Sequence, residues 1–151
     1  MVKRISIFSA PLLALVLACL VGCGDGPTEI ILTIEADPTV EAMIDHLELI
    51  AEDGRSDPRL ASTDIAPGDF PKTIGLLEET EAAGPIFIEV IGRLDGVRRI
   101  EARARISFEE GSSLSRTIYL YEECIGVFGC SGETTCGRGG ACAPIDTRGN
   151  D

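Results

Sequence analysis

The chain has 151 residues, 44% of them hydrophobic, which is enough for one ordinary folded domain and excludes disorder as a description of the whole chain. It carries 25 acidic against 13 basic side chains and a formal net charge of −12. Such an acidic chain is unsuited to non-specific binding of nucleic acid, so we expect no nucleic-acid partner. Trp is absent and only one histidine is present, and histidine is the side chain that most often acts in acid–base catalysis.

Residues 1–22 have the three parts of a secretory signal. A basic start at Lys3 and Arg4 precedes a long apolar stretch that ends in a small residue. A retained transmembrane helix is one alternative, but the stretch is slightly short of the ~20 residues that a span needs and contains Pro11. The sequence therefore predicts an export signal.

The signal ends in Leu20-Val21-Gly22-Cys23, and all four positions resemble the lipobox of bacterial lipoprotein precursors. The resemblance implies cleavage before Cys23, lipidation of its sulfur, and a membrane anchor of palmitate-type chains, which hold a protein stably when two or more are attached. A cleaved signal without lipid is the other alternative. Residues 23–28 are a Gly- and Pro-containing tether. Because Gly24 rather than Asp follows the cysteine, the resemblance implies the outer membrane of the bacterial cell envelope.

From residue 29 to residue 123 the apolar side chains recur mostly with a period of two, which is typical of half-buried strands. The predicted strands are Ile30–Ala36, His46–Glu52, a short edge strand around Ser62–Ile65, Lys72–Leu77, two strands within Ile86–Phe108, and Leu114–Tyr121. This pattern predicts an all-β fold, namely an antiparallel β-sandwich of immunoglobulin or fibronectin type over residues 29–123.

Two stretches of this region allow more than one interpretation. Residues 38–51 also fit an amphipathic helix, with Asp37 as N-cap and Pro38 as first helical residue; we favour a short helical turn over residues 38–44 followed by a strand. In the hairpin of residues 86–108, a two-residue loop would mix the two faces of the strands. A three-residue loop, Leu94-Asp95-Gly96, restores the alternation but sets Glu89 opposite Glu101.

The last segment, residues 124–151, is a small cysteine-rich tail. Cys124, Cys130, Cys136 and Cys142 are evenly spaced, and their even number in an exported chain predicts two disulfides, with three connectivities open. A four-thiolate zinc site is disfavoured because its ligands usually come in close pairs. The run from Thr135 to Cys142 resembles Cys-Gly-Cys pieces of small myxobacterial-type envelope lipoproteins, in which such a tail follows a β-sandwich; that resemblance implies no known activity.

No catalytic constellation, cofactor motif or metal-ligand spacing is visible, so we predict no catalytic residue, no cofactor, no metal site and no enzyme. The four side chains of Arg93, Arg99, Arg103 and Arg105 are predicted to share one face of the hairpin. Such a face suits an anionic polysaccharide or an acidic envelope protein; the alternative is a solvated face that neutralises its own acids.

The predicted function is therefore that of a membrane-anchored envelope lipoprotein acting as a structural or binding module, held in the membrane through Cys23. An alternative is an inhibitor of a secreted hydrolase, with a disulfide-stapled loop as its inhibitory element. An enzyme is a third alternative, which the missing catalytic groups disfavour.

Overall fold

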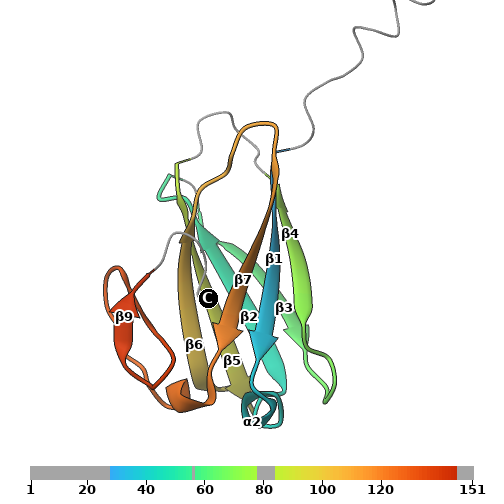
Figure 1. Ribbon diagram of the computed structural model, residues 1–151. Coiled ribbons are helices and arrows are strands. Elements are labelled where there is room, and N and C mark those ends of the chain that lie inside the picture. Colours follow the sequence, from blue (N-terminus) through green and yellow to red (C-terminus); the bar gives the residue numbers. More distant parts are fainter. Residues whose placement is uncertain (1–27, 56, 78–83, 146–151) are drawn as a thin grey trace, which may run out of the picture.

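The computed structural model describes residues 28–55, 57–77 and 84–145 (Figure 1). The predicted signal, the lipidation site at Cys23 and the last six residues of the tail lie outside the described residues. The elements are β1 (Glu29–Ala36), α2 (Pro38–Glu41), β2 (His46–Glu52), β3 (Arg59–Asp64), β4 (Lys72–Leu77), β5 (Ile86–Leu94), β6 (Val97–Ile106), β7 (Ser113–Leu120), η1 (Glu122–Cys124), β8 (Thr134–Cys136) and β9 (Cys142–Pro144).

Seven of these strands form two facing sheets, of order β4-β1-β7 and β3-β2-β5-β6, which confirms the predicted all-β sandwich. All pairs are antiparallel except β1 and β7, which run parallel from Glu29 opposite Ser113 to Ala36 opposite Leu120. The first and last strands of the sandwich are thus neighbours. An immunoglobulin constant domain orders its strands A-B-E-D in one sheet and C-F-G in the other. Here the first strand lies between the fourth and the last, so the likeness to immunoglobulin and fibronectin domains is one of architecture and not of strand order.

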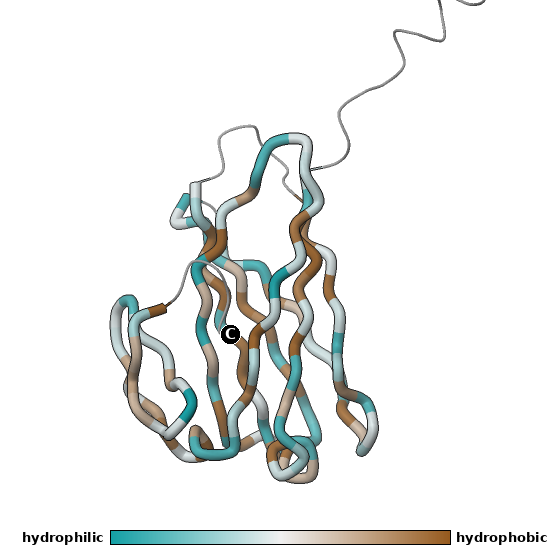
Figure 2. Tube along the Cα trace, viewed as in Figure 1, coloured by the Kyte–Doolittle hydropathy of each residue, from teal (hydrophilic) through white to brown (hydrophobic). Residues whose placement is uncertain are grey.

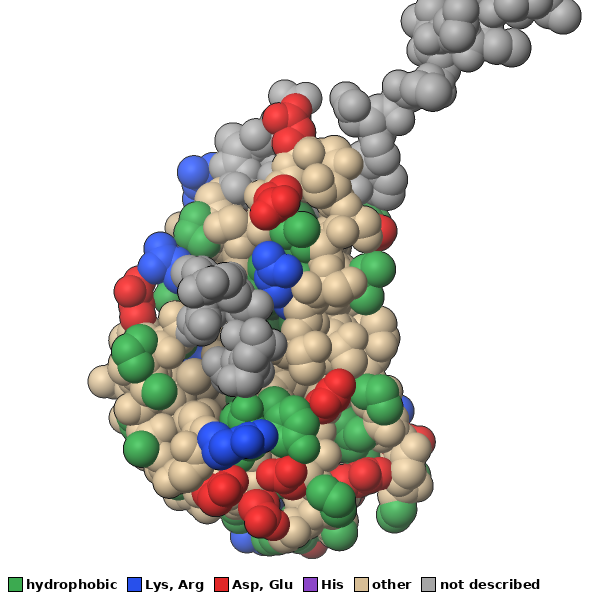
Figure 3. Space-filling view, viewed as in Figure 1, with side chains coloured by type: hydrophobic (Ala, Val, Ile, Leu, Met, Phe, Trp, Pro, Cys, Tyr) green, Lys and Arg blue, Asp and Glu red, His purple; other side chains and the backbone are tan. Residues whose placement is uncertain are grey.

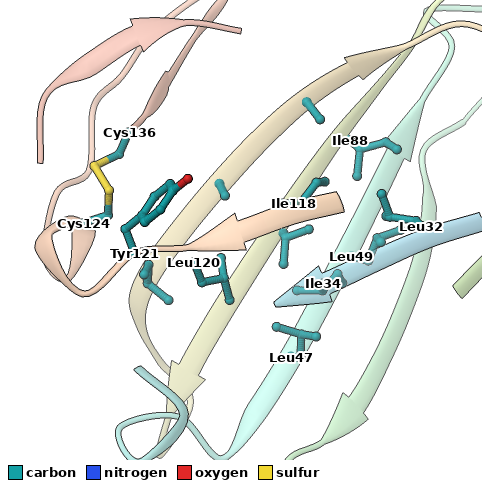
Figure 4. Packing of buried hydrophobic residues seen from close by; sticks show 14 of the residues in the cluster. Leu32, Ile34, Leu47, Leu49, Ile88, Ile118, Leu120, Tyr121, Cys124 and Cys136 are labelled. Carbon is teal, nitrogen blue, oxygen red and sulfur yellow. A yellow bond between two sulfur atoms is a disulfide. The ribbon is translucent and has the colours of Figure 1, made fainter. Parts of the chain in front are cut away.

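The core lies between the sheets and follows from strict alternation along each strand. On β1 the inward side chains Ile30, Leu32 and Ile34 are fully buried, whereas their neighbours on the strand are partly or fully exposed. Brown and pale positions alternate along the strands in Figure 2 for this reason. Figure 4 shows inward side chains of β1, β2, β5 and β7 packed in one cluster, of which the labelled members include Leu32, Ile34, Leu47, Leu49, Ile88, Ile118 and Leu120.

The prediction of a short helical turn followed by a strand is confirmed, since α2 is one turn long and β2 begins at His46. The Asp37 carboxylate accepts hydrogen bonds from the Tyr119 hydroxyl at 2.9 Å and from the Glu122 amide at 2.8 Å, so it ties the start of α2 to the end of β7. The hydrogen bond to Asp37, together with burial, raises the pKa of Tyr119.

The predicted loop of the β5–β6 hairpin is wrong. The turn has two residues, Asp95 and Gly96, both with positive φ (+52° and +76°), and Leu94 pairs with Val97. The faces are restored by a β-bulge, in which Gly92 pairs with Ile100 and Arg93 with Arg98, so that one residue of β6 has no partner. The like-charge pair is therefore avoided: Glu89 lies opposite Arg103 instead of Glu101. The edge strand β3 also begins earlier than predicted, at Arg59.

We predict that Gly92→Ala lowers the free energy of unfolding by about 1–3 kcal/mol, because overpacking a closed core forces side chains apart. A Cβ at this position would lie 2.8 Å from Cγ2 of Ile100 and 3.0 Å from Cγ2 of Ile44, and both isoleucines are stiff and buried. Gly75→Ala is the matched strand control, since its Cβ would meet nothing within 4 Å. Urea unfolding of the full chain followed by circular dichroism measures both; equal midpoints would contradict the packing at Gly92.

Candidate functional site

The tail is held by two interleaved disulfides, Cys124–Cys136 and Cys130–Cys142, with Cα atoms 5.8 and 5.5 Å apart. Both predicted bridges are thus present, and of the three open connectivities this is the one that the structure has. Three of the four cysteines are buried in the same cluster as the sandwich core, and Figure 4 shows the Cys124–Cys136 bridge beside Tyr121. The tail therefore packs against the sandwich.

Hydrogen bonds seat the tail on β6, the outermost strand of its sheet. The Gly126 amide donates to the carbonyl of Arg99 at 2.8 Å, and the Arg103 amide donates to Oγ1 of Thr135 at 2.9 Å. The Arg103 guanidinium also donates to the carbonyl of Cys130. The first two bonds satisfy backbone groups of β6 that no sandwich strand reaches, so the tail covers this edge of the sheet.

Three of the four predicted face arginines hold carboxylates of this same chain. Arg93 donates twice to Glu48, at 2.9 and 2.8 Å. Arg103 lies 3.2 Å from Glu89 and 3.3 Å from Glu101, and Arg105 pairs with Glu133 of the tail.

The fourth arginine, Arg99, is the extra residue of the bulge. Its Nε is buried and has no hydrogen-bond partner among the described residues. Sequence reasoning missed Arg98, which the bulge places opposite Arg93 and which pairs with Glu101 at 2.6 Å. Glu101 itself is only 4% exposed, so this network is partly removed from water.

The face is therefore a ladder of opposite charges across β2, β5, β6 and the tail. An anionic ligand would have to displace Glu48, Glu89 or Glu133 to reach a guanidinium in its bidentate geometry. Arg105 also lies over the ring of Phe87, 5.5 Å from its centroid, which further fixes its position. The geometry supports a role of these arginines in holding the sheet and tail together.

A groove of about 280 Å³ opens on the other side of the sandwich, between β3 and β4. Its floor is apolar, because Leu47 and Leu49 of β2 and Ile74 of β4 reach it from the core; the remaining lining residues are Ala61, Ser62, Thr63, Lys72 and Thr73. All six residues of β3 are exposed. Sequence reasoning did not find this groove, since nothing in the sequence says that β3 and β4 become the outer strands of two different sheets.

One end of the groove carries charged side chains. Lys72 forms an ion pair with Asp69 at 3.0 Å, and the hydrogen bond from the Ala66 amide, followed by that from Lys72, lowers the pKa of Asp69. The side chain of Asp64 at the end of β3 is 97% exposed and lies 3.0 Å from Nδ1 of His46. The single histidine thus has a surface carboxylate as its partner.

Comparison of the chain with known protein families, with curated proteins and with solved structures finds no match. In the described ranges, no helix is long and apolar enough to cross a membrane. Nor do His, Cys, Asp and Glu side chains of those ranges gather in any group of three or more that could hold a metal ion.

We predict that Arg103→Ala lowers the free energy of unfolding by about 3 kcal/mol, because it leaves the buried Glu101 with one cation fewer and frees the Cys130 carbonyl. Arg105→Ala is the control on the same strand and face, and since its pair with Glu133 is exposed it should cost less than about 1 kcal/mol. Urea unfolding of both variants compares them. An equal loss would mean that Arg103 has no special role.

We predict the disulfide pairs Cys124 with Cys136 and Cys130 with Cys142 in the isolated protein. Proteolysis after Phe128, Glu133 and Arg138 puts the four cysteines on four different peptides, so mass spectrometry without reduction reads the pairs directly. Each expected pair should appear as one linked mass that splits on reduction. Any other pairing, or free thiols that can be alkylated, would contradict the structure of the tail.

Proposed function

We propose that this chain is a lipid-anchored protein of the bacterial cell envelope whose β-sandwich is a binding module for another envelope protein. The observation that supports the lipid anchor is the position of Cys23, which ends the Leu20–Cys23 lipobox directly after an export-type apolar stretch. Because Gly24 follows the cysteine, the outer membrane is the proposed site.

The spacing between the cysteine and the folded domain supports this arrangement. β1 begins at Glu29, and the intervening Gly-Asp-Gly-Pro-Thr leaves a tether that spans at most about 20 Å when extended. Such a tether would keep the sandwich close to the membrane and limit its partners to molecules at the membrane surface.

The two disulfides support an oxidising compartment outside the cytoplasm. Disulfides persist in the envelope and on the cell surface, whereas the cytosol keeps thiols reduced. The tail that they staple has little apolar content of its own, and cross-links of about 3 kcal/mol each compensate for that small core. A chain that depends on such bridges is suited to export.

The open side of the sandwich, between β3 and β4, is the surface that we propose for binding. It offers an apolar floor with uncovered strand edges, whereas Arg93, Arg103 and Arg105 already hold carboxylates of the same chain. Apolar floors rimmed by polar groups are typical of sites that bind protein segments or small molecules. The arginine face is therefore not part of the proposed binding surface.

We predict that Cys23→Ser abolishes labelling by radioactive palmitate and leaves the precursor unprocessed, because the sulfur that carries the lipid is missing. Cys19→Ser is the matched control, since Cys19 lies four residues upstream within the signal and should leave labelling and processing unchanged. Expression in a Gram-negative host, with gel analysis of both variants, measures the outcome. Labelling that persists in Cys23→Ser would overturn the anchor.

A further inference from the structure

The two sheets of the sandwich have four outer strands, and three of them are protected against pairing with other chains. The tail hydrogen-bonds to the edge of β6. β7 carries Arg116 on its core-facing side, directly beside Leu32, and an inward-pointing charge is a common protection of strand edges. β3 begins and ends in charged residues, Arg59 and Asp64.

β4 is the fourth outer strand, and its protection is confined to one end, where Lys72 shares the core-facing side with Ile34. After Lys72 its residues are Thr73-Ile74-Gly75-Leu76-Leu77, without charge or proline. The strand pairs with β1 on one side only, and in the described part of the chain no hydrogen bond reaches the backbone on its other side. Leu77 is 62% exposed. An exposed edge of this kind is a template for another strand.

The groove adds a second feature beside this edge. Lys72, Thr73 and Ile74 line it together with residues of β3, so a strand laid along β4 would lie at its mouth. Alternate side chains of that strand would point toward the apolar floor of Leu47 and Leu49. Backbone pairing and side-chain burial are thus available to the same ligand.

Charge indicates the chemistry of the ligand at one end. Lys72 lies opposite Ile34 of β1, two residues before that strand ends and leads into α2. Acidic side chains gather at the end of the sandwich that carries α2 (Figure 3). At this end Asp69 is paired with Lys72, whereas the Asp64 side chain stays 97% exposed although it lies 3.0 Å from Nδ1 of His46. A basic residue on the ligand would find a partner here.

We propose that β4 takes an extended segment of a partner protein as the fourth strand of the β4-β1-β7 sheet. The segment has apolar side chains at alternate positions and a Lys or Arg at the Lys72 end of β4. This inference rests on the proposed function of the sandwich as a binding module, and it adds the site and the class of ligand. A second copy of the chain is a poorer occupant, because two copies of net charge −12 repel each other.

The test uses the purified full chain in detergent and fluorescein-labelled nonapeptides of alternating valine and threonine. One probe has lysine at both ends, and one has glutamate at both ends. The third is the lysine probe with every second amide N-methylated. It is made in both registers, so that in one version the methyl groups lie on the edge that pairs with β4. We expect the lysine probe to bind at least roughly tenfold more tightly than either other probe in fluorescence anisotropy, since N-methylation removes several backbone hydrogen bonds.

Hydrogen exchange locates the bound probe. In the free protein the unpaired amides of β4 should exchange fast, and the lysine probe should slow their exchange at least roughly tenfold while leaving β7 unchanged. Thr73→Pro and Ile74→Pro form an internal pair of variants, because successive amides of a strand point to opposite edges. One of them should keep the fold and lose probe binding, and the other should destabilise the pairing with β1.

Three results would overturn the proposal. Equal binding of the N-methylated and unmodified lysine probes would mean that side chains in the groove, and not the strand edge, hold the peptide. Protection confined to β3 or the tail would place the site elsewhere. Dimerisation through β4 in sedimentation would make a second copy the occupant. None of these results bears on palmitate labelling at Cys23, so failure of this inference and failure of the anchor are told apart.

Discussion

Every strand at the edge of a sheet presents unpaired backbone groups. These groups must be hydrogen-bonded, covered or protected against pairing with other chains, and a two-sheet sandwich has four such strands. Several features of this molecule protect these edges. The tail lies along β6 and forms hydrogen bonds with it, and its disulfides hold it there because a short Gly-rich segment has too little apolar surface to fold alone. Arg116 occupies a position on β7 where the pattern calls for an apolar side chain. Of the other two edges, β3 begins and ends in charged residues, and β4 adjoins a groove into the core.

The bulge in β6 links the core to the charged face. A two-residue turn at Asp95 and Gly96 would by itself place arginines toward the core, and the extra residue in β6 turns the strand back into phase. Its side effect is a crowded corner, where Arg98 joins Arg103 around Glu101. The same Arg103 reaches the tail through the Cys130 carbonyl. Register in one hairpin therefore determines which arginine meets which acid and where the tail is fastened.

The strands were predictable because burial on one face imposes a period of two, and β4 and β2 have the predicted bounds. The bulge was not predictable, since one inserted residue shifts the alternation of the strand without a recognisable change in composition. Pairing of Arg105 with Glu133 joins residues 28 apart in sequence, and no local pattern reports such a contact. The groove could not be predicted for a related reason. Strand spacing in the sequence indicates how many strands exist, whereas the order of the strands within each sheet decides which of them are outermost. Disulfide connectivity likewise depends on the fold of the tail.

The central position of β1 also has a mechanical consequence. β1 is the first strand of the fold and lies between β4 and β7, so a pull on the chain at Glu29 runs along the strand axis and is opposed on both sides. In this geometry the hydrogen bonds of both ladders are sheared together, whereas a strand pulled sideways from an edge opens them one after another. A domain held from the membrane through β1, as we propose, would resist tension through a strand that is paired on both sides.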